Sequence, residues 1–206
     1  MAQESSTTGW VSSRAGLAGR RSIASRLVGK RITEVHYVTL DYGGWDLGHH
    51  DQSVRRAITD TSEWRNPSWD WGQFHHIDWG IEFSVEEGEL WSLTWDPPGE
   101  TQSLLLDEGP TPELGAAEWD VTDQEPWSSC VDSVVTDVQL RYHPWNVDED
   151  SFWCSRISIF FGARHVETLL ATRGPTDTVL IPSANDIAVL LDPSHLPAWE
   201  RTDDLV

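Results

Sequence analysis

Apolar and polar residues alternate along several stretches of this chain, and this period of two constrains the fold more than any other feature. Between Ile77 and Val85, every second residue is apolar. Because successive side chains of an extended chain point to opposite faces, the pattern predicts a half-buried β-strand, with Trp79 packing on the same face as Phe83. The turn residues 86–88 and a second strand-like run over 90–95 follow, so this region predicts a β-hairpin.

Further strand-like runs, rich in β-branched and aromatic residues, recur along the chain. They cover residues 31–40, 103–106, 131–142, 153–161, 165–170, 178–181 and 187–191. Helical patterns are few: a short helix in the N-terminal stretch at 15–27, and one turn near 113–119. The sequence therefore predicts a mainly β fold, with a β-rich α+β fold as the alternative.

The strand pattern of the first half of the chain returns in the second half. The triplet at 33–35, Thr-Glu-Val, is matched by Thr-Asp-Val at 136–138, an offset of 103 residues, and the hairpin positions match at an offset of 76. Two unrelated meanders would share the period of two but not the triplet, so the match favours an internal duplication. We expect two tandem, related β-meander halves that form one sandwich or barrel-like core.

The two offsets also predict how the chain is organised. They differ by 27, so the first half carries about 27 extra residues, which lie within 43–76. A connection this long in a compact domain is usually functional or disordered. The expected parts are a flexible or short-helical N-terminus (1–26), a first β half (27–106) with the inserted loop at about 43–76, a linking segment (107–128), a second β half (129–192) and a C-terminal tail (193–206).

The chain is strongly acidic, with 34 Asp and Glu against 14 Lys and Arg, and a formal net charge of −20 at pH 7. The acidic residues concentrate after residue 60, where 28 of them face only six basic residues. A body of this charge repels nucleic acid phosphates and anionic membranes, whereas it attracts basic proteins and speeds their encounter. We therefore expect a basic protein partner, no direct nucleic-acid binding and no membrane binding. A general solubility role of the charge is the alternative.

The inserted loop combines tryptophan, histidine and arginine side chains. Disordered segments are poor in aromatic residues, so we expect it to fold onto the body of the protein. Tryptophan and arginine are enriched at binding hot spots, which makes this loop the leading candidate for a binding surface. The candidate binding residues are Trp45, Trp64, Trp69, Trp71, Arg55, Arg56 and Arg65. The alternative is that these tryptophans fill a thin core.

The same region offers imidazole and carboxylate groups that could bind a metal ion. The candidates are His49, His50, His75, His76 and Asp78. Neighbouring histidines on a strand point to opposite faces, so an adjacent pair cannot easily share one ion, and we favour neither a metal site nor a cofactor. A metal-dependent hydrolase that uses His and Asp near 49–51 and 75–78 stays an alternative function.

No GxSxG elbow and no glycine-rich phosphate loop is present in the sequence. The two cysteines, Cys130 and Cys154, are too few for a disulfide framework and lack CxxC spacing, so we expect both to be reduced and buried. No apolar run reaches the about 20 residues of a membrane span, and the N-terminus lacks the apolar core of a secretory signal. These features predict a cytoplasmic protein.

Together these features favour a non-enzymatic acidic binding protein that holds or neutralises a basic partner. The acidic charge, the 13 tryptophans and the β-rich pattern are similar in type to those of small bacterial immunity and defence-accessory proteins, although no motif carries the likeness. A sugar- or small-ligand-binding β-sandwich with exposed tryptophans is a further alternative.

Overall fold

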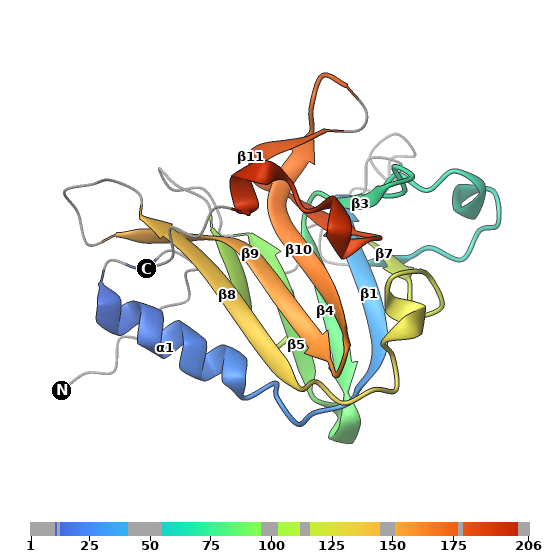
Figure 1. Ribbon diagram of the computed structural model, residues 1–206. Helices are drawn as coiled ribbons and strands as arrows, with labels where there is room; N and C mark the ends of the chain where they lie inside the picture. Colours follow the sequence, from blue (N-terminus) through green and yellow to red (C-terminus); the bar gives the residue numbers. More distant parts are fainter. Residues whose placement is uncertain are drawn as a thin grey trace.

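The computed structural model describes residues 11, 13–40, 55–95, 103–111, 116–144, 151–176 and 179–201. These residues form two packed β-sheets and one α-helix (Figure 1). The mainly β fold predicted from the period of two is confirmed, and the arrangement of the two sheets matches a β-sandwich.

The first sheet has six strands in the order β2-β7-β1-β4-β5-β6. All neighbours are antiparallel except the short β2, which runs parallel to β7. The strands are β1 (Ile32–Leu40), β2 (Arg56–Ala57), β4 (Gly80–Val85), β5 (Leu90–Trp95), β6 (Leu104–Glu108) and β7 (Ala116–Asp120).

The second sheet has five antiparallel strands in the order β3-β11-β10-β9-β8. The strands are β3 (Phe74–Ile77), β8 (Asp137–Pro144), β9 (Phe152–Phe161), β10 (Arg164–Arg173) and β11 (Leu180–Leu190). Strand β9 also contacts β6 of the first sheet. There the hydroxyl of Ser103 accepts a hydrogen bond from the backbone N–H of Cys154 over 2.6 Å, which joins the two sheets at one corner.

The main core lies between the sheets, and it contains the apolar faces that the alternation predicted. Ile81 and Phe83 of β4 are fully buried, as are Ile157 and Ile159 of β9, and all four belong to one cluster. Figure 1 shows β9 and β10 of the second sheet in front of β4 and β5 of the first. Burial of such apolar faces is the dominant favourable contribution to folding.

The strand predicted over 77–85 is in fact two strands. Strand β3 ends in the second sheet and β4 begins in the first, so the chain crosses between the sheets at Asp78-Trp79. Trp79 is buried, as expected, but it packs with Val38 in a separate cluster and not with Phe83. The alternation continues through the crossing, and therefore a period of two cannot reveal it.

Helix α1 (Arg14–Ser25) contacts β6 and β8, the last strands of the two sheets on one side of the sandwich (Figure 1). Ser13 caps the helix by accepting a hydrogen bond from the N–H of Gly16 over 3.1 Å. The buried Arg20 forms an ion pair with Asp107 of β6 at 3.3 Å. This is the short N-terminal helix that the sequence predicted. Among the described residues, no helix is long and apolar enough to cross a membrane.

The segment 107–128, predicted as a linker, instead contributes to the first sheet, because β6 extends into it and β7 pairs with β1. The predicted helical turn near 113–119 is wrong over its described part, where residues 116–119 belong to β7. Five 3-10 helices complete the described structure: η1 (Glu63–Arg65), η2 (Glu86–Gly88), η3 (Trp127–Ser129), η4 (Pro193–His195) and η5 (Ala198–Glu200).

Strands β1, β4, β5 and β6 follow the same antiparallel order in the first sheet as β8, β9, β10 and β11 in the second. Tyr37 pairs with Ile81 as Leu140 pairs with Ile157, at the offsets predicted from the sequence. In the return strand the match shifts by one position. Ile81 pairs with Leu93 in the first sheet, so the offset of 76 predicts that Ile157 pairs with Leu169, but it pairs with Thr168. The internal duplication stays a prediction, because unrelated meanders can also share a strand order.

Candidate functional site

The tryptophan-rich insert is described from residue 55 onward. Trp45, His49 and His50 lie outside the described residues, so nothing follows for them. The other candidates do not gather at one place. Some enter the core between the sheets, and others lie on the outer face of one sheet or the other.

Trp69 lies in the core between the sheets and is 3% exposed. Its ring packs edge-on against Tyr37 and against His75, with centroids 5.4 Å and 4.6 Å away. Tyr37 belongs to β1 of the first sheet and His75 to β3 of the second, so Trp69 connects the two sheets. Its ring is not accessible to a partner. Trp69 therefore fills the core, which was the alternative to a role in binding.

Beside Trp69, the hydroxyl of Tyr37 accepts a hydrogen bond from Nε1 of Trp127 over 2.7 Å and contacts Nδ1 of His75 at 2.8 Å. Because an indole N–H only donates, the phenolic proton goes to His75, and Nδ1 of His75 is an acceptor. Burial lowers the pKa of His75 to about 4. The imidazole is therefore neutral at pH 7, and its lone pair at Nδ1 is used inside the core.

Trp64 of η1 extends this aromatic cluster. Its ring lies edge-on to Trp119 of β7 at 5.3 Å and to Trp69 at 6.0 Å between centroids. Its Nε1 donates a hydrogen bond to the carbonyl of Ile58 over 3.2 Å. Trp64 is half-buried, so part of its ring remains at the surface while the rest packs on the core.

Trp71 lies on the outer face of the second sheet, where it stacks on His76 with centroids 4.1 Å apart and 14° between the ring planes. The exposed Arg173 lies over the same indole, 5.2 Å from its centroid. Nε2 of His76 is 3.0 Å from Oδ1 of Asp186. Although burial opposes it, hydrogen bonds from His76 and Ser183 lower the pKa of Asp186. Trp71 is thus a half-exposed aromatic ring with a cation beside it.

Arg55 lies on the outer face of the first sheet. Its guanidinium binds Glu82 through two hydrogen bonds, of 2.7 Å and 2.9 Å, and Glu118 through one of 3.2 Å. The N–H and the hydroxyl of Thr111 also donate to Glu82, over 2.6 Å and 2.7 Å. Although burial opposes it, these hydrogen bonds lower the pKa of Glu82. Arg55 is therefore held in an internal network.

The remaining insert arginines differ in their surroundings: Arg56 pairs with Glu63 at 3.0 Å, whereas Arg65 is exposed. Internal pairing extends through the whole protein. Within the part of the chain that the structure describes, at least eight of the 14 Lys and Arg side chains form an ion pair with a carboxylate, namely Arg20, Arg26, Lys30, Arg31, Arg55, Arg56, Arg141 and Arg156. Much of the small positive charge of this chain is thus neutralised internally.

His75 and His76 lie on opposite faces of β3, as expected for adjacent residues of a strand. His75 enters the core, and His76 lies beside Trp71, so the two cannot ligate one ion. Asp78 accepts a hydrogen bond from the backbone N–H of Leu40 over 2.9 Å. Within the described part of the chain, no group of three or more His, Cys, Asp or Glu residues could hold a metal ion.

The two cysteines are free and buried, as predicted. Burial raises the pKa of the Cys130 thiol and, more strongly, that of Cys154. The thiolate is the reactive form of cysteine, and reactive cysteines have a lowered pKa. Neither residue therefore has the surroundings of a nucleophile.

Sequence reasoning missed an ion cluster on the outer face of the second sheet. Glu200 of η5 is fully buried there, with Oε2 3.2 Å from Nε of Arg141 and Oε1 3.4 Å from Nε2 of His143. Nε of Arg156 lies 3.8 Å from Glu200 and 3.7 Å from Glu167, and burial raises the pKa of Glu167. The cluster joins the C-terminal tail to β8 and β9, a non-local contact that no periodic pattern indicates.

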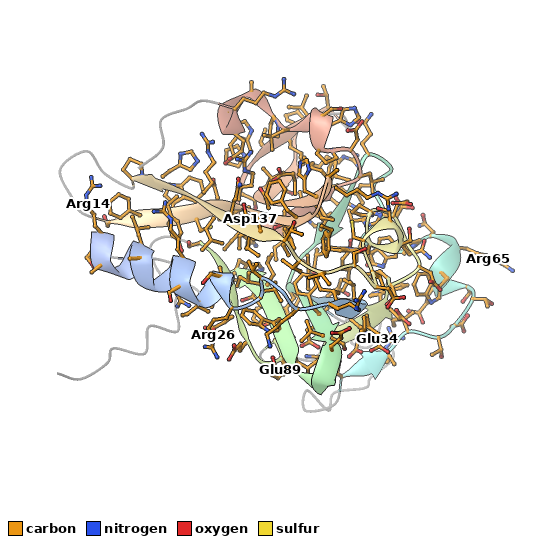
Figure 2. All side chains as sticks on the ribbon, turned by 60° about the horizontal axis from the view of Figure 1, so that its bottom comes forward. Arg14, Arg26, Glu34, Arg65, Glu89 and Asp137 are labelled. Atoms are coloured by element: carbon orange, nitrogen blue, oxygen red, sulfur yellow. The ribbon has the colours of Figure 1, made fainter. Side chains whose placement is uncertain are left out.

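Exposed carboxylates gather at the end of the sandwich where β1 begins, β4 turns into β5 and β7 leads to β8. Hydrogen bonds from the N–H of Glu86 to Arg31 and from the N–H of Asp132 to Ile32 hold these segments together. We call this surface the acidic end, and its carboxylates are Glu34, Glu86, Glu89, Asp120, Asp123, Glu125, Asp132 and Asp137. Figure 2 turns this end towards the viewer and labels three of them.

Positive charge at the acidic end is scarce. Lys30 pairs with Glu89, and Arg31 pairs with Glu86. The other six carboxylates of the acidic end form no ion pair with a lysine or arginine among the residues that the structure describes. Their negative charges therefore repel one another, and an approaching cation would relieve that repulsion.

Comparison of the chain with models of known protein families, with curated proteins and with solved structures gave no match. A functional proposal therefore rests on the charges and the geometry of this chain.

Proposed function

We propose that this chain is a non-enzymatic binding protein that holds a basic protein partner at its acidic end. The observation that supports the proposal is the set of six exposed carboxylates there without a lysine or arginine partner among the described residues. In the described region, the catalytic alternatives lack comparable support: His75 is buried and neutral, and it cannot share an ion with His76.

Internal pairing is what makes this surface selective for a basic partner. At least eight of the 14 basic side chains already pair with carboxylates of the described residues, while the net charge of the whole chain is −20. Among the described residues, the six carboxylates of the acidic end that have no such pair are exposed. Charges of this kind raise the association rate with a cationic protein and disfavour acidic competitors. Exposed pairs are screened over about 8 Å at physiological ionic strength, so binding weakens as salt rises.

The finer form of the proposal is a cytoplasmic protein of the immunity or defence-accessory type, which neutralises a basic toxin or regulates a basic enzyme. Trp71 lies on the outer face of the second sheet, a different surface from the acidic end, and is not counted among the contacts of this proposal. Trp69 is not part of this proposal, because its ring lies in the core.

The test is capture of a partner by the immobilised full chain from lysate of its own source cells, at about 50 mM and about 500 mM salt, read by quantitative mass spectrometry. One triple variant removes three negative charges from the acidic end, through the substitutions Asp123→Asn, Asp132→Asn and Asp137→Asn. Asparagine suits position 132, where φ is +62°, because it tolerates the left-handed region. We expect one specific basic protein at low salt, and about tenfold weaker capture by the triple variant.

The matched control carries the same change of charge elsewhere: Asp60→Asn, Asp70→Asn and Asp192→Asn. Each of these side chains accepts a hydrogen bond from a backbone N–H two residues ahead, and asparagine can keep that contact. The control variant should capture the partner as the wild type does. Equal losses in both variants, or a specific partner that is acidic, would rule out the acidic end as the binding surface.

A further inference from the structure

Residues 193–201 cross the outer face of the second sheet as two single 3-10 turns, η4 and η5. Figure 1 shows this segment, in dark red, lying across β10. Its backbone hydrogen bonds run from His195, Leu196, Glu200 and Arg201 to carbonyls within residues 192–198. Among the described residues, no backbone–backbone hydrogen bond connects this segment to a strand.

The segment is instead held by side chains, and the first of these is Trp199. Its Nε1 donates a hydrogen bond to the carbonyl of Leu180 over 3.2 Å. Together with Leu196, its ring covers a cluster of apolar side chains on the outer face of the sheet. That cluster is separate from the main core and consists of Phe74, Leu169, Ala171, Leu180, Ala188 and Leu190.

The second anchor is Glu200, which is fully buried although it carries a carboxylate. Its oxygens contact Arg141 at 3.2 Å and His143 at 3.4 Å. Arg156 is the looser contact, since its Nε is 3.8 Å from Glu200, and among the described residues neither this Nε nor that of Arg141 forms a hydrogen bond with Glu200. A well-formed Arg–carboxylate pair has N–O distances of about 2.7–2.9 Å, so this cation cluster does not bind Glu200 in an optimal geometry.

The surface beneath the segment therefore has two halves, one apolar and one cationic, in a chain that is otherwise strongly negative. The chain's own Trp199 fills the apolar half, and its own Glu200 fills the cationic half. A peptide with a tryptophan followed by an acidic residue has complementary chemistry to both halves.

We propose that residues 193–201 form a strap that undocks as a unit and thereby opens this surface to an acidic, tryptophan-containing peptide segment of a partner protein. Undocking breaks side-chain contacts and leaves the strand ladders intact. Segments with this kind of attachment open with a lower free energy than the global fold. This proposal concerns a different face from the acidic end and does not depend on the basic partner proposed above.

Hydrogen–deuterium exchange on the full chain tests the undocking. In the wild type, amides of residues 194–201 should exchange at least about tenfold faster than the paired amides of β10 and β11. Glu200→Gln should accelerate exchange in the strap and leave β10 and β11 unchanged. The matched control His195→Ala alters an exposed strap side chain and should change neither. Exchange in the strap that rises only together with exchange in β10 and β11 overturns the proposal, because the strap would then open only with the whole fold.

Peptide binding tests the surface. The probe is an N-acetylated, C-amidated peptide of residues 193–201, titrated into the full-chain Trp199→Ala variant, whose own strap is weakened. We expect binding at least about tenfold tighter than to the wild type, and about tenfold weaker binding when the peptide itself carries Glu200→Gln. Absence of binding to the variant, or equal binding of the two peptides, overturns the assignment of this surface. If Trp199→Ala does not fold, the same titration into Glu200→Gln decides between these outcomes.

Discussion

The hydroxyl of Tyr37 on β1 donates a hydrogen bond to Nδ1 of His75 on β3, and so two buried side chains connect the two sheets. Trp127 donates to the same hydroxyl from the connection between β7 and β8. The hydroxyl of Tyr37, Nε1 of Trp127 and Nδ1 of His75 each have a partner inside the core. Burial of His75 lowers its pKa and keeps its imidazole neutral, which has consequences for how the fold responds to acid.

Acidification is expected to destabilise the fold through His75. Its pKa is about 4 in the folded protein, against 6.5 for an unperturbed histidine. The neutral imidazole is favoured by folding, so this stabilisation is complete above about pH 6.5 and is lost as the pH falls towards 4, by up to about 3 kcal/mol. Chemical denaturation of the wild type and His75→Gln across this range checks the effect. The difference in unfolding free energy between the two proteins should narrow on acidification, and a constant difference would contradict the assignment.

Tyr37→Phe should destabilise the protein without creating a large cavity. The variant leaves the indole N–H of Trp127 and Nδ1 of His75 unpaired in the core, and each unsatisfied buried group costs about 1–3 kcal/mol. Urea denaturation at neutral pH measures the loss, with the midpoint moving to lower urea and the slope unchanged. A change below about 0.5 kcal/mol would show that water replaces the hydroxyl.

Gly80→Ala should destabilise the crossing between the sheets by about 1–3 kcal/mol. An added Cβ at Gly80 would lie 2.9 Å from the Cγ2 atoms of Thr111 and Thr94 and 3.1 Å from the carbonyl of Leu93. Gly19→Ala is the matched control, because its Cβ would meet no atom within 4 Å and it lies in α1. The control should raise stability by up to about 1 kcal/mol through helix propensity. Thermal unfolding should show a lower midpoint temperature for Gly80→Ala and a higher one for Gly19→Ala. Equal shifts at both sites would refute the steric explanation.

Arg55→Met should cost about 3 kcal/mol, since it leaves the carboxylate of Glu82 buried without its cationic partner. The neighbouring Arg56→Met is the control. Its partner Glu63 has a side chain 36% exposed, and such pairs contribute at most about 1 kcal/mol. Denaturant unfolding of the two variants gives the comparison. Comparable losses would mean that burial of Glu82 does not determine the strength of the pair.

Local alternation predicted the position of most strands. It failed where pairing with a neighbouring strand determines whether a strand ends or continues. Strands β1, β5 and β9 lie where the pattern placed them, within one or two residues. The short runs at 178–181 and 187–191 proved to be one strand, β11, whose register against β10 shifts between Leu170 and Ala171. The irregular part contains Pro182, Ser183 and Asn185, which are typical turn residues, so the sequence alone predicts a turn between two strands there. Pairing with β10 on both sides of that part is what maintains the strand.

Composition identified the aromatic insert but could not separate its members. Trp69 and Trp71 are two residues apart, yet one lies in the core and the other lies on the outer face of the second sheet. Their placement depends on the turn that carries Asp70 and on the pairing of β3 with β11. The burial of Glu200 against Arg141 was equally hidden, because the two residues are far apart in the sequence and neither has a local signature.

Helix α1 also limits how this sandwich can meet another chain. It flanks β6 and β8, while the other two outermost strands are β2, with two residues, and β3, whose outer edge pairs with the turn at 69–71. Long open strand edges invite strand addition and fibril growth. Since these outermost strands are flanked by α1, very short or paired with a turn, we expect another protein to bind the sandwich mainly through side-chain contacts rather than by adding a strand to a sheet.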